Sequence, residues 1–174
     1  MLQGTVTFRP LAHADMPLLH GWLNAPHMRA HYQRQPMTLD EVIAKYTPRI
    51  DGRVDTHCHI ALLGDKPFGK IQCFSNAHFP DFSAEEVLDT GISLDIFIGE
   101  GDMIGQGLGP RMLQAYLKDV AFRIFEGETH CYICHAADNP AAIRSSLKAG
   151  FRFLRDVIEA DAPAKLYVIE KKNL

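Results

Sequence analysis

The segment from Gly91 to Ile124 constrains the fold most, because a predicted strand leads through a glycine-rich turn into a long helix. Residues 92–98 alternate between two faces, as a strand does, and apolar residues at helical spacing run on to Ile124. Glycine lets the backbone approach a ligand closely, and the free N–H groups at a helix start bind phosphate. The segment therefore predicts a pyrophosphate site at the start of this helix, where glycines stand at 105, 107 and 109.

Two other phosphate motifs fit this turn poorly. No Gly-Lys-Ser/Thr ends it, so it is not a Walker loop. The elements before it look antiparallel, whereas a dinucleotide fingerprint follows the first strand of a parallel unit. A glycine-rich turn that is only a loop remains the alternative.

The remaining patterns predict an α+β, or mixed α/β, chain with a central mixed, mostly antiparallel sheet flanked by helices. Asp15 is expected to cap the first helix, and Thr38 with Glu41 forms a capping box before the second. The other elements expected are strands at 5–11, 57–63, 68–74, 130–135, 151–158 and 166–169 and a helix from Asn139 to Gly150, with 161–163 joining the last two strands.

Composition narrows the class of protein. The chain has 174 residues, 47% of them hydrophobic, which predicts one domain over residues 1–174. Its net charge of -3 argues against a nucleic-acid partner and agrees with a cationic substrate. Neither a signal peptide nor an apolar run of about 18 residues occurs, so we expect no membrane partner, a cytoplasmic location and reduced cysteines.

Several motifs together resemble the GNAT acetyltransferase superfamily. They are the glycine turn at 104–109, Asn139-Pro-Ala-Ala-Ile-Arg at 139–144 and Lys-Ala-Gly-Phe at 148–151. Within it the chain looks most similar to the aminoglycoside 6'-N-acetyltransferases, and the resemblance runs from Thr5 to about Ile169. The segments behind the closer resemblance are 21–24, the acidic residues Glu85, Glu86 and Asp89, and the stretches 94–100 and 161–164.

The resemblance implies a sheet splayed into a V, with acetyl-coenzyme A in the cleft. It also implies the residues that hold this cosubstrate. The pantetheine arm would run beside Ile96, Phe97 and Ile98, and Asn139 would hold the cofactor from the next strand–helix junction. The pyrophosphate would be cradled by Gly105, Gln106, Gly107, Leu108 and Gly109.

Three positions depart from the family pattern. Ile104 stands where Arg or Gln is favoured, and Ser146 stands where many members carry a Tyr that protonates the leaving thiolate. Cys134 stands where some resistance enzymes carry Asp. The last two departures bear on acid catalysis and on aminoglycoside specificity.

Amine attack on a thioester needs a proton acceptor and a polarised carbonyl. Asp95, in the middle of an apolar strand just before the glycine turn, is the candidate acceptor, directly or through water. A backbone N–H near Ile96 or Phe97 would polarise the carbonyl. Ser146 is the candidate proton relay to the thiolate. The alternatives are a buried structural Asp95 and a Ser146 on the helix surface.

Candidate acceptor-binding residues are acidic or aromatic. Glu85, Glu86, Asp89 and Asp161 would bind a polycation through charge-assisted hydrogen bonds, unless they only form solvated loops. Trp22 is expected either to line the substrate cleft or to belong to the core.

The cysteines and histidines also form patterns that we weigh against metal or haem. Cys131 to His135 has the c-type haem spacing, but the run reads as a strand. His57 and His59 would face away from Cys58, so no zinc set forms and we expect no metal.

These features predict an acyltransferase: an acetyl-CoA-dependent N-acetyltransferase of a small amine, with the aminoglycoside 6'-amine as leading acceptor. Another small amine or a siderophore-type acceptor is the first alternative. A non-catalytic acyl-CoA-binding regulatory module, suggested by Ser146, is the second. The sequence leaves open the acceptor, a role in antibiotic resistance, and whether the chain is a monomer or a homodimer.

Overall fold

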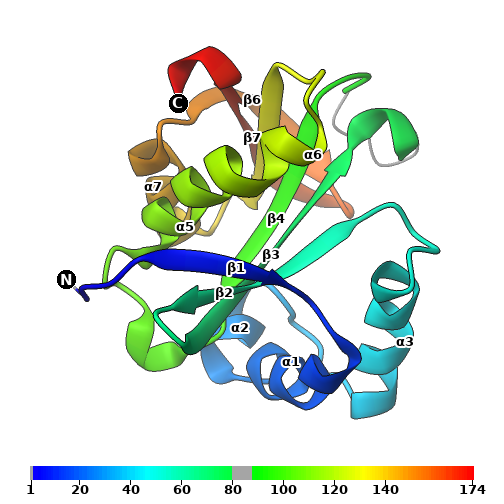
Figure 1. The fold of residues 1–174 in the computed structure, drawn as a ribbon. Helices are drawn as coiled ribbons and strands as arrows, with labels where there is room; N and C mark the ends of the chain where they lie inside the picture. The colour runs from blue at the N-terminus through cyan, green and yellow to red at the C-terminus, as the bar shows by residue number, and fades with distance from the viewer. Residues whose placement is uncertain (1, 80–87) are drawn as a thin grey trace. The chain divides into compact units, whose positions relative to one another are not determined.

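The computed structural model describes residues 2–79 and 88–174, which form a mixed α/β fold (Figure 1). The strands are β1 (Val6–Pro10), β2 (His57–Leu63), β3 (Lys66–Ser75), β4 (Ile92–Ile98), β5 (His130–Ala136), β6 (Arg152–Glu159) and β7 (Ala162–Glu170). The helices are α1 (Met16–Leu23), α2 (Pro26–His31), α3 (Leu39–Ile50), α5 (Leu108–Tyr116), α6 (Phe122–Ile124) and α7 (Pro140–Ala149).

The seven strands form one sheet in the order β1-β2-β3-β4-β5-β7-β6. Pairs β1–β2, β5–β7 and β6–β7 are antiparallel, whereas β4 pairs with β5 in parallel. The predicted fold class, a mixed and mostly antiparallel sheet flanked by helices, is thereby confirmed.

The chain divides into two compact units, and β3 and β4 contribute residues to both. The first unit comprises Met1–Gln72 with Ile96–Gln106, and the second Cys73–Asp95 with Gly107–Leu174. None of the helices described here is long and apolar enough to cross a membrane.

Apolar side chains from three helices and two strands build the core of the first unit. Thr38 and Glu41 form the predicted capping box at the start of α3, with Thr38 N–H donating to the Glu41 carboxylate at 2.7 Å. The buried core residues are Leu11, Met16, Leu19, Trp22, Leu23, Met28, Val42, Tyr46, Cys58, Ile60 and Phe97. Burial of such side chains is the main force that holds α1 and α3 in place.

Asp15 stands at the predicted N-cap position of α1, but its side chain makes no capping hydrogen bond to the helix. The Asp15 carboxylate turns back and accepts two hydrogen bonds of 2.7 Å from the Arg9 guanidinium and one of 2.9 Å from Ala12 N–H. These charge-assisted bonds occupy the carboxylate, and the Arg9 hydrogen bonds lower the pKa of Asp15.

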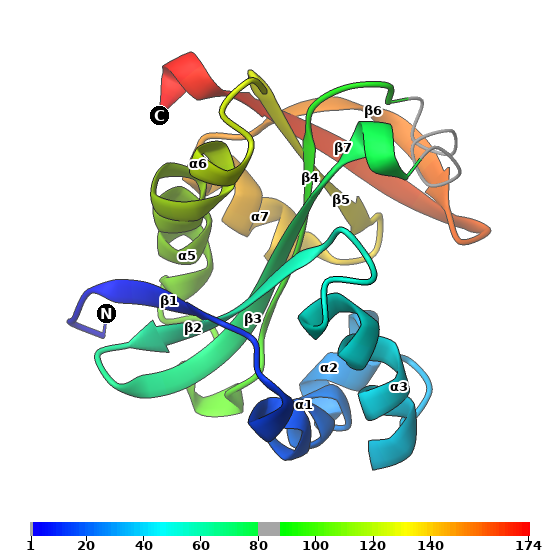
Figure 2. The same cartoon turned by 45° about the vertical axis from the view of Figure 1, so that its right-hand side comes forward.

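In the second unit, α5 and α7 lie side by side (Figure 2). The sequence predicts one helix through Ile124, but the chain widens into a π turn over Leu117–Ala121 before α6. Such a turn inserts one extra residue without ending the helix, so the apolar spacing alone does not reveal it.

The β6–β7 hairpin is longer than predicted, because β7 begins at Ala162 and not at Leu166. Glu159 pairs with Ala162, so Ala160 and Asp161 alone form the turn, with φ angles of 48° and 61°. Positive φ at both central residues is the geometry of a type I′ turn, which matches the strand twist. An alanine in this left-handed region is strained.

Replacing Ala160 by Asn is expected to raise the free energy of unfolding by about 0.5–1 kcal/mol, because Asn tolerates a positive φ better than Ala. Urea unfolding monitored by circular dichroism measures the change. Ala162→Asn, two residues later on the strand, is the matched control and should bring no gain. Equal effects of the two substitutions would contradict the strain argument.

Candidate active site

The glycine turn before α5 has the backbone geometry of an anion-binding loop. Gly105 and Gly107 have φ angles of 76° and 77°, and Gly107 is the residue that caps α5. Without a side chain, Gly107 leaves the first N–H groups of the helix to an outside acceptor, and the helix dipole favours a negative one. The turn can therefore receive a phosphate group.

Helix α7 packs directly against the first turn of α5. A Cβ at residue 109 would clash with the Oγ atom of Ser145, so any residue larger than glycine there would require this side chain to move. Asn139 caps α7, its Oδ1 accepting from Ala142 N–H at 3.1 Å. The amide of Asn139 thus has a structural role, and its contact with a cofactor stays a prediction.

Asp95 lies on β4 immediately after the last residue that pairs with β5. The parallel register joins Ile92 to Cys131 and Leu94 to Ile133, while both strands continue further. Asp95 is half-buried, and its negative charge acts on the imidazole of His135. The structure therefore brings the predicted base near a histidine that the sequence analysis does not assign to the site.

Ser146 is fully buried on α7 and forms a pair with that histidine. Its Oγ lies 2.7 Å from Nε2 of His135, and the two side chains are 0% and 9% exposed. The alternative of a surface serine is wrong, because α7 turns this residue toward β5. Alternation along β5 is the sequence signal for His135, since Cys131, Ile133 and His135 share its buried face.

Burial lowers the pKa of His135 to about 4, against the opposing effect of the Asp95 charge. The ring is therefore neutral near pH 7, with one nitrogen that donates and one that accepts a hydrogen bond. A neutral imidazole beside a buried hydroxyl can orient the hydroxyl proton.

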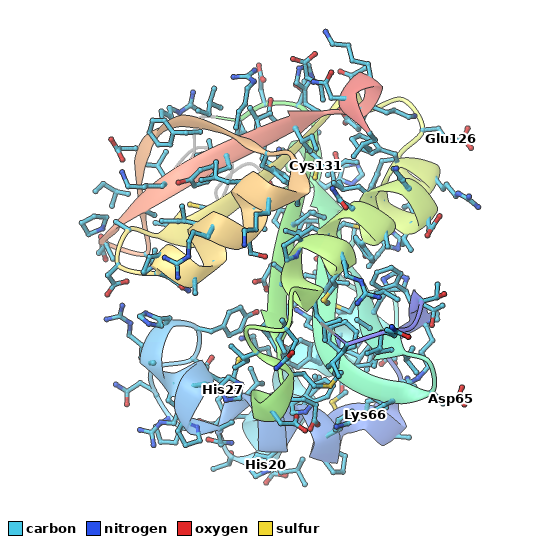
Figure 3. All side chains as sticks on the ribbon, turned by 90° about the vertical axis from the view of Figure 1, so that its left-hand side faces the viewer. His20, His27, Asp65, Lys66, Glu126 and Cys131 are labelled. Carbon is cyan, nitrogen blue, oxygen red and sulfur yellow. The ribbon has the colours of Figure 1, made fainter. Side chains whose placement is uncertain are left out.

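Ile96, Phe97 and Ile98 lie on the part of β4 that belongs to the first unit. The carbonyl oxygen of Ile98 is 3.1 Å from Nε2 of His27, which comes from α2 and is labelled in Figure 3. A carbonyl only accepts, so His27 carries its proton on Nε2. These contacts fix the strand that the resemblance places beside the pantetheine arm.

Trp22 is a core residue of the first unit. It is 5% exposed, meets the Phe97 ring edge-on at 6.1 Å and donates from Nε1 to Glu100 at 2.8 Å. Gly99 passes so close to the indole that no Cβ would fit. The core alternative for Trp22 is therefore observed, and a contact with the acceptor stays a prediction.

The family follows from the whole of this arrangement. A model of the acetyltransferase (GNAT) domain matches residues 12–158, which include β4, the glycine turn, α5 and α7. The chain belongs to the GNAT acetyltransferase family. The predictions of an acetyltransferase and of acetyl-CoA as its cosubstrate are confirmed.

Relatives of this GNAT acetyltransferase align with it over most of their own length. It is 28% identical over 172 residues to the aminoglycoside N(6')-acetyltransferases type 1 of Klebsiella pneumoniae and of Serratia marcescens, covering 97% of this chain and 84% of each relative. A structure of AAC(6')-Ib with paromomycin and acetyl-CoA superposes with a TM-score of 0.86 at 27% identity, over 97% of this chain and 95% of that one. An aminoglycoside N(6')-acetyltransferase of Legionella pneumophila has the same fold, with a TM-score of 0.74 at 22% identity, over 98% of this chain and 94% of that one.

The two acidic candidates that the structure describes lie outside the helices and strands. Asp89 is exposed before β4, and its charge adds to the burial that raises the pKa of Tyr132. Asp161 is exposed in the β6–β7 turn. Glu85 and Glu86 lie outside the described residues, so their predicted role in acceptor binding stays a prediction.

None of the four cysteines is in a disulfide bond. Cys131 and Cys134 stand on opposite faces of β5. Burial raises the pKa of the Cys131 thiol well above its usual value, so it stays protonated. In the two described stretches, no group of three or more His, Cys, Asp or Glu side chains is arranged to hold a metal ion.

The lowered pKa of His135 predicts a pH-dependent stability. Between pH 6.5 and 4 the unfolded chain binds a proton at this ring and the folded chain does not, so the free energy of unfolding falls as the pH falls. His135→Gln removes this contribution. We expect the loss of unfolding free energy from pH 7 to pH 5 to be about 2 kcal/mol smaller in the variant, measured by urea unfolding.

Burial also lowers the pKa of His59 to about 4, so His59→Gln is the positive control for this measurement. It should reduce the pH dependence in the same direction, and part of the dependence remains in each single variant. An unchanged pH dependence in His135→Gln would contradict the assignment of a buried neutral ring.

Proposed function

We propose that this acetyltransferase transfers the acetyl group of acetyl-CoA to the 6'-amine of an aminoglycoside. The observation that carries the proposal is the left-handed glycine turn at the start of α5, on a chain similar over 97% of its length to aminoglycoside N(6')-acetyltransferases. The net charge of -3 agrees with a polycationic acceptor. Acetyl-CoA is an intracellular metabolite, so we place the reaction in the cytoplasm.

The glycine turn is the proposed pyrophosphate site. Gly105 has open space around it, and the glycines at 105, 107 and 109 leave the turn without side chains at these three positions. These features fit an anionic diphosphate. When bound, acetyl-CoA supplies the activated thioester. Ile96 to Ile98 would line the pantetheine arm, and Asn139 would add a contact from the start of α7.

Asp95 is the proposed proton acceptor. The carboxylate would take a proton from the attacking amine, directly or through one water, while the amine nitrogen bonds to the thioester carbon. A backbone N–H at Ile96 or Phe97 would stabilise the oxyanion that forms. Breaking of the carbon–sulfur bond then leaves the electron pair on sulfur.

Acidic residues are the proposed acceptor-binding groups. Asp89, Asp161 and Glu86 would each bind an ammonium group of the acceptor through a charge-assisted hydrogen bond. Trp22 is the proposed aromatic support of the acceptor through its contacts with Phe97 and Glu100.

Acceptor-dependent thiol release across aminoglycosides, polyamines and amino acids tests the proposal. Release with polyamines alone would contradict the aminoglycoside assignment.

Gly107→Val is expected to raise the Kd for coenzyme A about tenfold or more. The side chain would stand where the backbone must approach the ligand, and a β-branched residue resists the φ of 77°. Isothermal calorimetry measures the affinity. Gly127→Val is the control, because no neighbouring atom lies within 4 Å of a Cβ there. Unchanged affinity in a folded Gly107→Val protein would refute the site.

Asp95→Asn is expected to lower kcat/KM on the order of 10²–10⁴-fold, because it removes the general base while keeping the size of the side chain. The Kd for coenzyme A should barely change. Asp119→Asn, at an exposed residue of the π turn, controls for the loss of one carboxylate. Melting temperatures are measured in parallel. A stable Asp95→Asn protein with wild-type kcat/KM across pH would remove Asp95 from the mechanism.

A further inference from the structure

Strand β6 forms an open edge of the sheet. It is the last strand in the order, and among residues 2–79 and 88–174 only β7 pairs with it. It has eight residues and no proline, whereas β1, at the other edge, has five and ends at Pro10, which has no N–H. Proteins commonly block such edges against a further strand, but β6 carries the apolar Ile158, which is 57% exposed. The edge is therefore available to another strand.

The hydrogen-bonding groups on this edge follow from the β6–β7 hairpin. Glu159 and Ala162 flank the two-residue turn, so they form the hydrogen-bonded pair that closes it. Bonding alternates along an antiparallel pair, so Asp156 and Ile158 direct their N–H and C=O groups away from β7. Pro163, which has no N–H, stands opposite Ile158 and agrees with this alternation. A further strand would therefore bond to Asp156 and Ile158.

Only a few registers are possible if β6 pairs with a second copy of itself. In a twofold dimer the two strands run antiparallel, and residues directly opposite each other lie on the same face of the sheet. The axis therefore passes between one residue and its own copy. An axis at Arg155 or Asp156 would bring like charges face to face. An axis at Ile158 would leave few residues paired before the turn, and the bulge between Phe153 and Arg155 ends regular pairing at the other end. The remaining register has its axis at Val157.

Pairing about Val157 matches both the charges and the backbone groups. Arg155, Val157 and Glu159 share one face of β6, so Arg155 of each copy would stand opposite Glu159 of the other. Opposite charges directly across an antiparallel pair are stabilising. Asp156 of each copy would stand opposite Ile158 of the other, and their outward N–H and C=O groups would bond. In this register the strand is complementary to itself.

We propose that the chain forms a homodimer by antiparallel pairing of β6 with β6 of a second copy, centred on Val157. The pairing joins two seven-stranded sheets into one. It also holds the hairpin whose turn carries Asp161, a proposed acceptor-binding residue. Because the paired segment is short, the dissociation constant of the dimer is expected on the order of 1–100 µM.

Sedimentation velocity over a series of protein concentrations tests the dimer without any need for turnover. The mass of the wild type should rise from one chain to two, and a protein that stays monomeric up to about 1 mM would overturn the proposal. Ile158→Pro removes an outward N–H and keeps the pairing with β7, so it should raise the dissociation constant about tenfold or more. Ile158→Thr keeps the N–H and is the matched control. Equal weakening by the two substitutions would overturn pairing through the backbone.

Charge reversal tests the register, also in the case that Ile158→Pro does not fold. Arg155→Glu would bring carboxylates face to face across the axis, and Glu159→Arg would do the same with guanidinium groups. Each variant alone should therefore be monomeric at concentrations where the wild type is a dimer. An equimolar mixture of the two variants should dimerise, because every facing pair in the mixed dimer is opposite in charge. A mixture that stays monomeric would overturn this register.

Discussion

The parallel pairing of β4 with β5 is the constraint on which the candidate site depends. Parallel neighbours cannot be joined by a tight turn, so the chain after β4 must cross over before it returns as β5. Helix α5 lies in that crossover, and the glycine turn stands between the end of β4 and the start of α5. The glycine turn is therefore placed at a helix N-terminus by the topology, and not by the local sequence alone.

The same pairing places the polar groups of the second unit. The register ends at Leu94 and Ile133, and the next residues of the two strands include Asp95 and His135. Apolar residues fill the positions before them, so these two titratable groups stand at the margin of a core. Burial there keeps His135 neutral, which costs stability in acid and gives a ring that can orient a hydroxyl.

Local interactions explain the elements that the sequence predicts well. The capping box of Thr38 and Glu41 and the αL glycines before α5 each act within a few residues, so the pattern and the structure agree. The predictions fail where a contact between residues apart in the sequence outweighs the local pattern, or where a change in helix geometry barely alters that pattern. Arg9 draws Asp15 away from the helix cap, and the π turn after Tyr116 keeps the apolar spacing nearly intact.

The sequence by itself determined the class of fold, the family and the glycine turn, because periodicity and short motifs record local backbone geometry. Only the tertiary structure decided that Trp22 lies in a core and that Ser146 faces inward. It alone paired Ser146 with His135, since the two residues are 11 positions apart on a strand and a helix. Which face of α7 meets β5 follows from side-chain packing between elements, and a linear pattern does not contain that contact.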